Sequence, residues 1–313
     1  MRGAEGAAAR VRFLVPPPLR KGDLVGVAAP GFAVERDKAE AGVRVLERLG
    51  LRVRLGASVF ARDGYFAGAD HSRSRDLVEL IEDPEIRAIH FARGGWGTSR
   101  FLASVPWGRL ARRPKLLIGY SDLTSLFAPA LDWAGLSCVY GPLVTELGER
   151  GKFDLASLRR AYFRPREAFT LRFAAKDVVV PGRAEGRAAG GCLTLLAHLA
   201  GTPYAPRLRR RVLLIEEIGE PPYRIDRMLT QMRLAGMLEG VTGVLVGGLE
   251  GCEPRPPSSP SASALEVIAS FFEPPRVPVV AGLRFGHVDR KLSLPLGFRI
   301  RLDTARRSLV FTP

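Results

Sequence analysis

Cysteine and histidine are scarce in this chain of 313 residues. The cysteines are three, an odd number, and their spacing matches no metal site, which argues against both a disulfide framework and a zinc centre. The histidines are four, so imidazole chemistry has few candidates. The residues concerned are Cys138, Cys192, Cys252, His71, His90, His198 and His287.

Long apolar runs are also missing. No stretch approaches the roughly 18 consecutive apolar residues that a membrane helix needs. The N-terminal segment MRGAEGAAARVRFLVPPPLRKGD lacks a secretory pattern, because its apolar stretch is short and is interrupted by arginine and proline. We therefore expect a folded cytoplasmic protein without a membrane segment, and its 46% of hydrophobic residues suffices for two cores.

Lysine contributes only six of the 47 basic residues, so the formal net charge of +15 comes mainly from arginine. Such a charge often indicates a nucleic-acid partner, because basic surfaces bind phosphate. Here the arginines are scattered along the chain, and no zinc finger, RNA-recognition motif or basic-aromatic stripe accompanies them. We therefore expect no nucleic-acid partner, and the positive field favours small anionic substrates.

The chain from about residue 23 to residue 140 alternates short apolar runs with amphipathic stretches, an order typical of parallel strands joined by helices. Residues 152–178 break this alternation, and more strands follow, the last two as a predicted hairpin. The sequence thus predicts an N-terminal α/β domain (1–150), an interdomain connection (151–180) and a C-terminal domain (181–313).

Two segments of the second half are rich in glycine or proline. The stretch GRAEGRAAGGCLTLLAHLAGTPY predicts a glycine-rich turn that enters a helix. Between two predicted strands, CEPRPPSSPSASA predicts an exposed, mobile loop.

The stretch KLLIGYSDLTSLF changes from a buried strand to a helical pattern at Ser121. Serine is a favoured N-cap residue, so Ser121 can be explained as the cap of the following helix. A serine at the tip of a strand-to-helix turn also suits a nucleophile, because the first helical N–H groups point at what the hydroxyl attacks. The second glycine of G-x-S-x-G is absent, which disfavours an ordinary α/β-hydrolase.

A nucleophilic serine needs a base and a group that orients the base. The apolar strand RVLLIEEIGE ends in Glu216 and Glu217, and we expect one of these two carboxylates to emerge into solvent. His287 follows a strand and Gly286, in a loop position from which an imidazole can reach a neighbouring cleft.

The glycines of ARGGWGTSR follow another predicted strand. Such glycines let backbone N–H groups turn toward an anion, as a tetrahedral oxyanion requires. Neither G-x-G-x-x-G nor a P-loop is present, so nucleotide binding has little support.

These segments together resemble the LD-carboxypeptidase family of serine peptidases. The resemblance extends over almost the whole chain, through VGVAAPG, DLVELIEDPEIRAIHFARGGWG, IGYSDLTSL, GGCLTLLAHLAGTPY, LLIEEIGEPPYRIDRMLTQM and GHVDRKLSLPLG. It implies an α/β fold with an N-terminal parallel-sheet α/β domain, a C-terminal β-rich α/β domain, and the active site at their interface.

The resemblance also implies the roles of individual residues. It identifies Ser121 as nucleophile, Glu216 rather than Glu217 as the acid, and His287 as the base. The backbone N–H groups that bind the oxyanion would belong to Gly95 and Asp122. No metal and no organic cofactor is implied. Two positions differ from the usual family pattern and are candidates for the substrate cleft: Trp96, where tyrosine is common, and Cys192, where asparagine is usual.

The implied function is hydrolysis of an L,D-peptide bond that releases a C-terminal D-alanine from cytoplasmic muropeptide tetrapeptides during cell-wall recycling. An immunity-type peptidase that cleaves a peptidyl-nucleotide antibiotic is the alternative, and it requires an aromatic loop for base stacking. A non-catalytic muropeptide-binding module would lack one of the three catalytic residues. The family resemblance also implies a homodimer.

Overall fold

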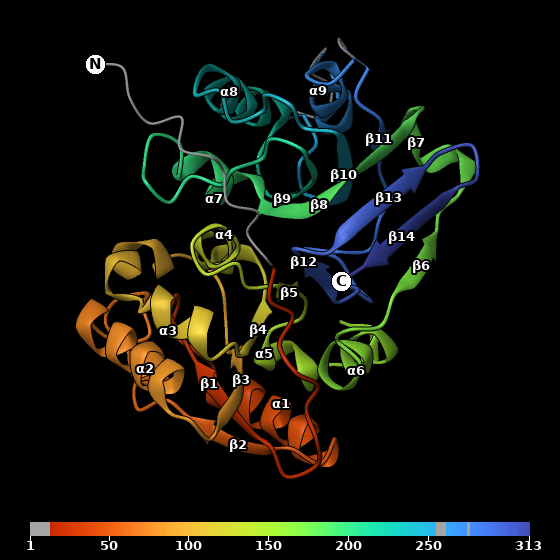
Figure 1. The fold of residues 1–313 in the computed structure, drawn as a ribbon. Coiled ribbons are helices and arrows are strands. Elements are labelled where there is room, and N and C mark those ends of the chain that lie inside the picture. Colours follow the sequence, from red (N-terminus) through yellow and green to blue (C-terminus); the bar gives the residue numbers. More distant parts are fainter. Residues whose placement is uncertain (1–12, 255–260, 274–275) are drawn as a thin grey trace, which may run out of the picture.

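The computed structural model describes residues 13–254, 261–273 and 276–313. Residues 255–260 of the predicted Pro/Ser-rich loop therefore lie outside the described residues. The described residues form an α/β protein with two sheets, the first built mainly from the N-terminal half and the second from the C-terminal half (Figure 1). Within the described residues, no helix is both long enough and apolar enough to span a bilayer.

The first sheet has six strands in the order β12-β5-β4-β3-β1-β2, and all pairs except β12 with β5 are parallel. Its strands are β1 (Leu24–Ala28), β2 (Arg52–Leu55), β3 (Ile86–Phe91), β4 (Leu116–Gly119), β5 (Cys138–Tyr140) and β12 (Leu294–Leu296). The helices of this half are α1 (Arg36–Arg48), α2 (Asp70–Glu82), α3 (Trp107–Arg112), α4 (Thr124–Asp132) and α5 (Val144–Leu147).

Both faces of the first sheet are covered, which explains why β1, β4 and β5 are buried at every residue, whereas the edge strand β2 alternates. In β1, Val25 and Val27 belong to the core that includes α1 and α5, whereas Leu24 and Ala28 belong to the core that includes α2 and α4. The parallel order places the carboxyl ends of β1, β3 and β4 at one edge, where ligand sites of such sheets form.

The second sheet has eight strands in the order β6-β14-β13-β8-β9-β10-β11-β7, with a parallel centre from β8 to β11 and antiparallel flanks. Its strands are β6 (Phe169–Arg172), β7 (Val178–Val180), β8 (Arg183–Cys192), β9 (Arg211–Ile218), β10 (Gly243–Glu250), β11 (Val279–Val280), β13 (Arg299–Asp303) and β14 (Ser308–Thr312). The predicted C-terminal hairpin is confirmed as β13 and β14. The helices of this half are α7 (Leu193–His198), α8 (Pro222–Leu234) and α9 (Ala264–Ser270).

The segment 151–180 contains regular structure that contributes to both halves. Its helix α6 (Leu155–Phe163) packs in the core beside α1, and its strands β6 and β7 form the two outer edges of the second sheet. In return, β12 comes from the C-terminal part of the chain and pairs with β5 in the first sheet. The two halves are therefore joined by more than one passage of the chain.

The prediction of a glycine-rich turn before α7 is wrong, because this segment is the strand β8 and runs directly into the helix. Gly190 and Gly191 have φ values of 130° and 148°. A Cβ at Gly190 would collide with the backbone of Leu214, and one at Gly191 with the side chain of Thr124. These glycines allow close approach of neighbouring backbone and of α4, not a turn.

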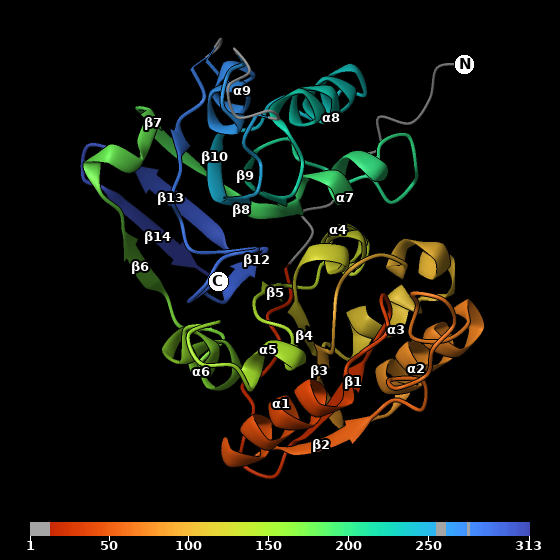
Figure 2. The ribbon, with the colours of Figure 1, turned by 180° about the vertical axis from the view of Figure 1, so that it is seen from behind.

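The second sheet meets the first along α4 and β12. Contacts join α4 to β8 and α7, and β12 to β8. Figure 2 shows from the opposite side that α4 and β12, the edge strand of the first sheet, face the second sheet. Across this boundary, Tyr140 at the end of β5 contacts Glu216 in β9.

Candidate active site

Ser121 lies directly after β4, at the start of the 3-10 turn η2 (Ser121–Leu123) that leads into α4. It is buried and has a φ of 64°, which is rare for a residue with a side chain and strained. Neither η2 nor α4 has a side-chain cap hydrogen bond. The cap explanation for this serine therefore has no support in the geometry.

The glycine loop predicted to bind an oxyanion packs directly against this serine. A Cβ placed on Gly94 would lie 3.0 Å from Ser121 Cβ and 3.3 Å from Ser121 Oγ, so glycine is needed for this approach. Gly95 has a φ of 98°. The N–H groups of Gly95 and Asp122 donate to no group in the part of the chain that the structure describes. Both donors are thus available to a ligand.

The side chain of Asp122 holds this loop in place. Its Oδ2 accepts hydrogen bonds from the backbone N–H of Thr98 at 3.0 Å and from the Thr98 hydroxyl at 2.6 Å. Burial raises the pKa of Asp122, and these hydrogen bonds with the charge of Arg73 oppose the rise. Asp122 therefore ties the turn after β4 to the loop after β3.

Glu216 and His287 are in direct contact. The imidazole Nδ1 of His287 lies 2.7 Å from Glu216 Oε2, and the backbone N–H of His287 donates to the same oxygen at 3.1 Å. Glu216 is fully buried in β9, and His287 is partly exposed in the loop between β11 and β12. Gly286, with a φ of 83°, allows this contact, because a Cβ there would collide with the Glu216 carboxyl group.

The environment of His287 shifts its pKa upward overall. Burial lowers the pKa, but the hydrogen bond and charge of Glu216, together with the charges of Glu217 and Glu146, outweigh burial. The ring of Tyr120 packs edge-on against the imidazole, with ring centroids 4.9 Å apart. An acid partner on Nδ1 leaves Nε2 for a proton acceptor or donor on the other side.

The expectation that one of the two glutamates reaches solvent is wrong, since Glu217 is as buried as Glu216. Glu217 Oε2 accepts hydrogen bonds from the Thr194 backbone N–H at 2.7 Å and from its hydroxyl at 2.8 Å. Burial raises the pKa of Glu217. The first turn of α7 supplies the partners that make this burial possible.

Tyr140, at the end of β5, is a site residue that the sequence did not reveal. Its hydroxyl donates to Glu216 Oε1 at 2.5 Å and accepts from the Ser121 N–H at 3.2 Å. Burial raises the pKa of Tyr140 well above its ordinary value, so the phenol keeps its proton. One hydroxyl thus connects Ser121 in the first sheet to Glu216 in the second. No hydrogen bond joins the Ser121 hydroxyl to His287.

A cavity of about 520 Å³ borders His287, and Tyr120, Glu146, Lys152 and Lys291 are among its lining residues. Of the two candidates for the substrate cleft, Trp96 packs against His198, with ring centroids 5.4 Å apart. Cys192 is buried and its Sγ lies 3.6 Å from Glu217 Oε1. Neither side chain lines the cavity at His287.

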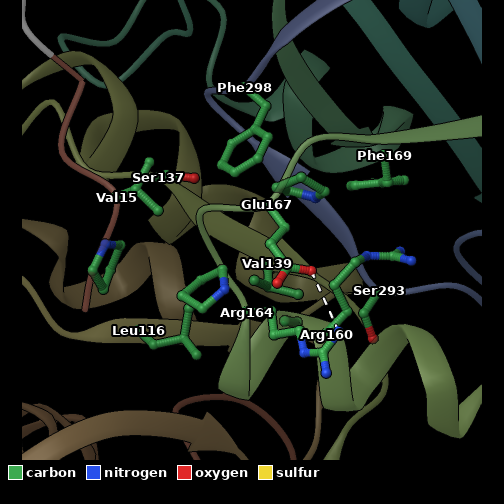
Figure 3. Close-up of a pocket in the computed structure, with 14 residues that line it drawn as sticks. Val15, Leu116, Ser137, Val139, Arg160, Arg164, Glu167, Phe169, Ser293 and Phe298 are labelled. Carbon is green, nitrogen blue, oxygen red and sulfur yellow. Dashed lines mark ion pairs between the residues drawn. The ribbon is translucent and has the colours of Figure 1, made fainter. Parts of the chain in front are cut away.

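A second, more enclosed and mainly apolar pocket lies elsewhere (Figure 3). It is formed by α6, β5, β12 and the N-terminal segment at Val15, and Phe298 and Leu116 contribute to its walls. None of the predicted site residues lines this pocket. This pocket is therefore separate from the predicted site residues.

The comparisons with known proteins agree with this architecture. Residues 25–141 match the N-terminal domain of LD-carboxypeptidases, and residues 185–302 match the C-terminal domain. The chain belongs to the LD-carboxypeptidase family.

Three relatives illustrate the range of this family. The chain is 35% identical to a probable murein peptide carboxypeptidase of Bacillus subtilis, over 94% of this chain and 93% of that one. It is 32% identical to a murein tetrapeptide carboxypeptidase of Pseudomonas aeruginosa, over 87% and 91% of the two chains. It is 25% identical to the microcin C7 self-immunity protein MccF of Escherichia coli, over 96% of each chain. A solved structure of MccF superimposes with a TM-score of 0.86, at 23% identity, over 96% of this chain and 98% of that one.

Proposed function

We propose that the protein is a serine LD-carboxypeptidase in which Ser121 is the nucleophile, His287 the base and Glu216 the group that orients the base. The observation that carries this proposal is the 2.7 Å contact between Glu216 and His287, at an interface where the strained turn of Ser121 is bound to the same glutamate through Tyr140. A nucleophile, a base and an orienting acid from three separate segments are the arrangement that acyl transfer needs.

In the proposed reaction, His287 accepts the proton of the Ser121 hydroxyl while Ser121 Oγ bonds to the carbonyl carbon of the amide. The oxyanion accepts hydrogen bonds from the N–H groups of Gly95 and Asp122. His287 gives its proton to the leaving nitrogen and the C–N bond breaks. Water then attacks the acyl-enzyme, with His287 accepting its proton and returning one to Ser121 Oγ.

The proposed substrate is a muropeptide tetrapeptide with a C-terminal D-alanine, cleaved in the cytoplasm during cell-wall recycling. Support comes from two relatives that align over most of both chains, one named a probable murein peptide carboxypeptidase and the other a murein tetrapeptide carboxypeptidase. Apart from water, the reaction as proposed uses only side chains and backbone groups of this protein. A homodimer is the proposed assembly.

Cleavage of a peptidyl-nucleotide antibiotic is the second candidate, because the fold matches that of MccF. A nucleobase would need an aromatic side chain on which to stack. The segment CEPRPPSSPSASA contains no aromatic residue, which favours the muropeptide over the nucleotide conjugate.

The test follows D-alanine release from a purified tetrapeptide by mass spectrometry, with wild type and Ser121→Ala. Ser125→Ala is the matched control, because Ser125 is a buried serine on α4 whose hydroxyl has no hydrogen-bond partner. We expect release by wild type and Ser125→Ala and a loss of at least about 1,000-fold in Ser121→Ala. An inactive wild type would direct the search to peptidyl-nucleotide amides, and equal rates in all three proteins would refute the role of Ser121.

A further inference from the structure

The position of His287 indicates where a leaving group would lie. The imidazole must reach the leaving nitrogen to protonate it, so the released residue has to lie against His287. The terminal carboxylate of that residue is about 2.5 Å from its nitrogen, across two covalent bonds. It must therefore occupy the cavity at His287 or the space directly next to it.

Next to the cavity at His287 lies another cavity, of about 240 Å³, which differs from the apolar pocket of Figure 3. Glu146 and Lys152 line both this cavity and the cavity at His287. Arg93 and Lys38 are also among its lining residues. Arg93 immediately precedes Gly94, the residue in contact with Ser121. Arg93, with its guanidinium group, is thus only two residues before the proposed oxyanion donor Gly95 in the sequence.

Four lysine and arginine side chains line the two cavities, and three of them form ion pairs. Lys38 lies 3.1 Å from Glu35, and Lys152 lies 2.9 Å from Asp289. Lys291 lies 2.6 Å from Glu146, which also accepts a hydrogen bond from the hydroxyl of Tyr120.

Arg93 forms no ion pair with any residue that the structure describes. Its Nη1 donates to the backbone oxygen of Ala33 at 2.6 Å, and its guanidinium carbon lies 5.8 Å from the ring centroid of Phe32. These contacts fix the side chain but use only part of the five N–H donors of a guanidinium. The remaining donors suit a carboxylate, which guanidinium groups bind through two parallel hydrogen bonds.

We propose that Arg93 binds the α-carboxylate of the C-terminal residue that the enzyme releases. This inference rests on the proposed function, and it explains how the site selects a chain end over an internal peptide bond. Two of the three glutamates that line this cavity, Glu35 and Glu146, have cationic partners of their own. No ion pair in the described part of the chain joins Arg93 to the third, Glu149, so the guanidinium remains for the substrate.

The test compares a tetrapeptide that ends in a free carboxylate with the same peptide ending in a carboxamide. Both are given to wild type, Arg93→Gln, Arg93→Lys and the control Arg233→Gln, and kcat/KM is measured for each pair. Arg233 also lies over a phenylalanine ring, that of Phe271, but it is exposed on α8 and lines neither cavity. We expect Arg93→Gln to lose about 10- to 100-fold on the free acid and less than about threefold on the amide. Arg93→Lys should be intermediate, and Arg233→Gln should resemble wild type.

The possible outcomes distinguish failure of the proposed Arg93 role from failure of the proposed carboxypeptidase function. If wild type releases D-alanine but Arg93→Gln loses the same factor on both peptides, the carboxylate role is wrong and the proposed function stands. If wild type itself cleaves acid and amide equally, carboxylate recognition is absent and the inference is overturned without any variant. If wild type releases nothing from either peptide, the proposed function fails and this inference fails with it.

Discussion

The hydroxyl of Tyr140 lies 2.5 Å from Glu216 Oε1, so a side chain of the first sheet binds a carboxylate of the second. The same hydroxyl accepts the Ser121 N–H. We interpret Tyr140 as a positioning residue that sets the distance between the proposed nucleophile and the proposed acid. This role predicts effects that differ from those of a purely structural tyrosine.

Tyr140→Phe keeps the ring and removes this connection. We expect kcat/KM to fall about tenfold, because a hydrogen bond to a charged group is lost. Glu216 would then direct more of its charge at His287, so the acid limb of the pH profile should move to higher pH. Tyr162→Phe is the control, since that buried hydroxyl binds His90 instead. A Tyr140→Phe enzyme with an unchanged pH profile would reduce the residue to a packing role.

The backbone at Ser121 predicts an unusual order of stability. Glycine adopts a positive φ without strain, whereas alanine keeps the strain and loses the hydroxyl. Ser121→Gly should therefore be more stable than Ser121→Ala by about 1 kcal/mol in urea unfolding, while both lack activity. Ser125→Gly against Ser125→Ala should show the opposite order, because Ser125 is inside α4. The same order at both positions would contradict strain at Ser121.

The raised pKa of His287 sets the expected pH dependence. The proposed base works only when neutral, so activity should rise with pH through a pKa above 6.5, the ordinary value of histidine. The main groups that act on it are Glu216, Glu217 and Glu146, and Glu216→Gln should move the midpoint down while lowering the rate. The stability of the folded protein depends on pH in the opposite direction. The raised pKa of His287 stabilises the folded state fully at pH values below the histidine pKa of the unfolded chain. This stabilisation is lost as the pH rises through the higher pKa of the folded protein. A kcat/KM midpoint below pH 6 in wild type would be incompatible with this arrangement.

His90 predicts a separate loss of stability in acid. Burial lowers the pKa of His90 to about 4, and its ring binds the Tyr162 hydroxyl at 2.5 Å and the Pro142 carbonyl oxygen at 2.7 Å. Below pH 6.5, His90 is protonated in the unfolded chain but stays neutral in the folded protein. The free energy of unfolding therefore falls by about 1.4 kcal/mol per pH unit until the pH reaches the pKa of His90 in the folded protein. Urea unfolding at pH 7 and pH 5 should show a smaller difference in His90→Gln than in wild type. The exposed His71→Gln is the control, and equal differences in all three would contradict the assignment.

The sequence predicted the elements of the site better than their partners. Ser121 comes shortly after β4, Glu216 lies near the end of β9, and His287 lies in the loop after β11. This local pattern is readable because an apolar run ends at or near each polar residue. Tyr140 escaped notice because its partner Glu216 is 76 residues away on another sheet, and an apolar strand ending in tyrosine is ordinary. Glu217 was misjudged because the N–H group that binds it comes from the first turn of α7, which the strand pattern does not contain. Gly190 and Gly191 were read as a turn because their close neighbours Leu214 and Thr124 are not evident from the sequence.

The return of β12 to the first sheet has a consequence for how such a protein can change over time. The loop that carries His287 begins after β11 in one sheet and ends at β12 in the other, where Ser137 Oγ donates to Leu296 O at 2.6 Å. A recombination event that exchanged only the first 150 residues with a relative would separate β5 from the strand that matches it. The two halves therefore depend on each other for strand pairing as well as for the contact between Tyr140 and Glu216, so a chimaera should retain a stable fold only if β5 and β12 come from the same parent.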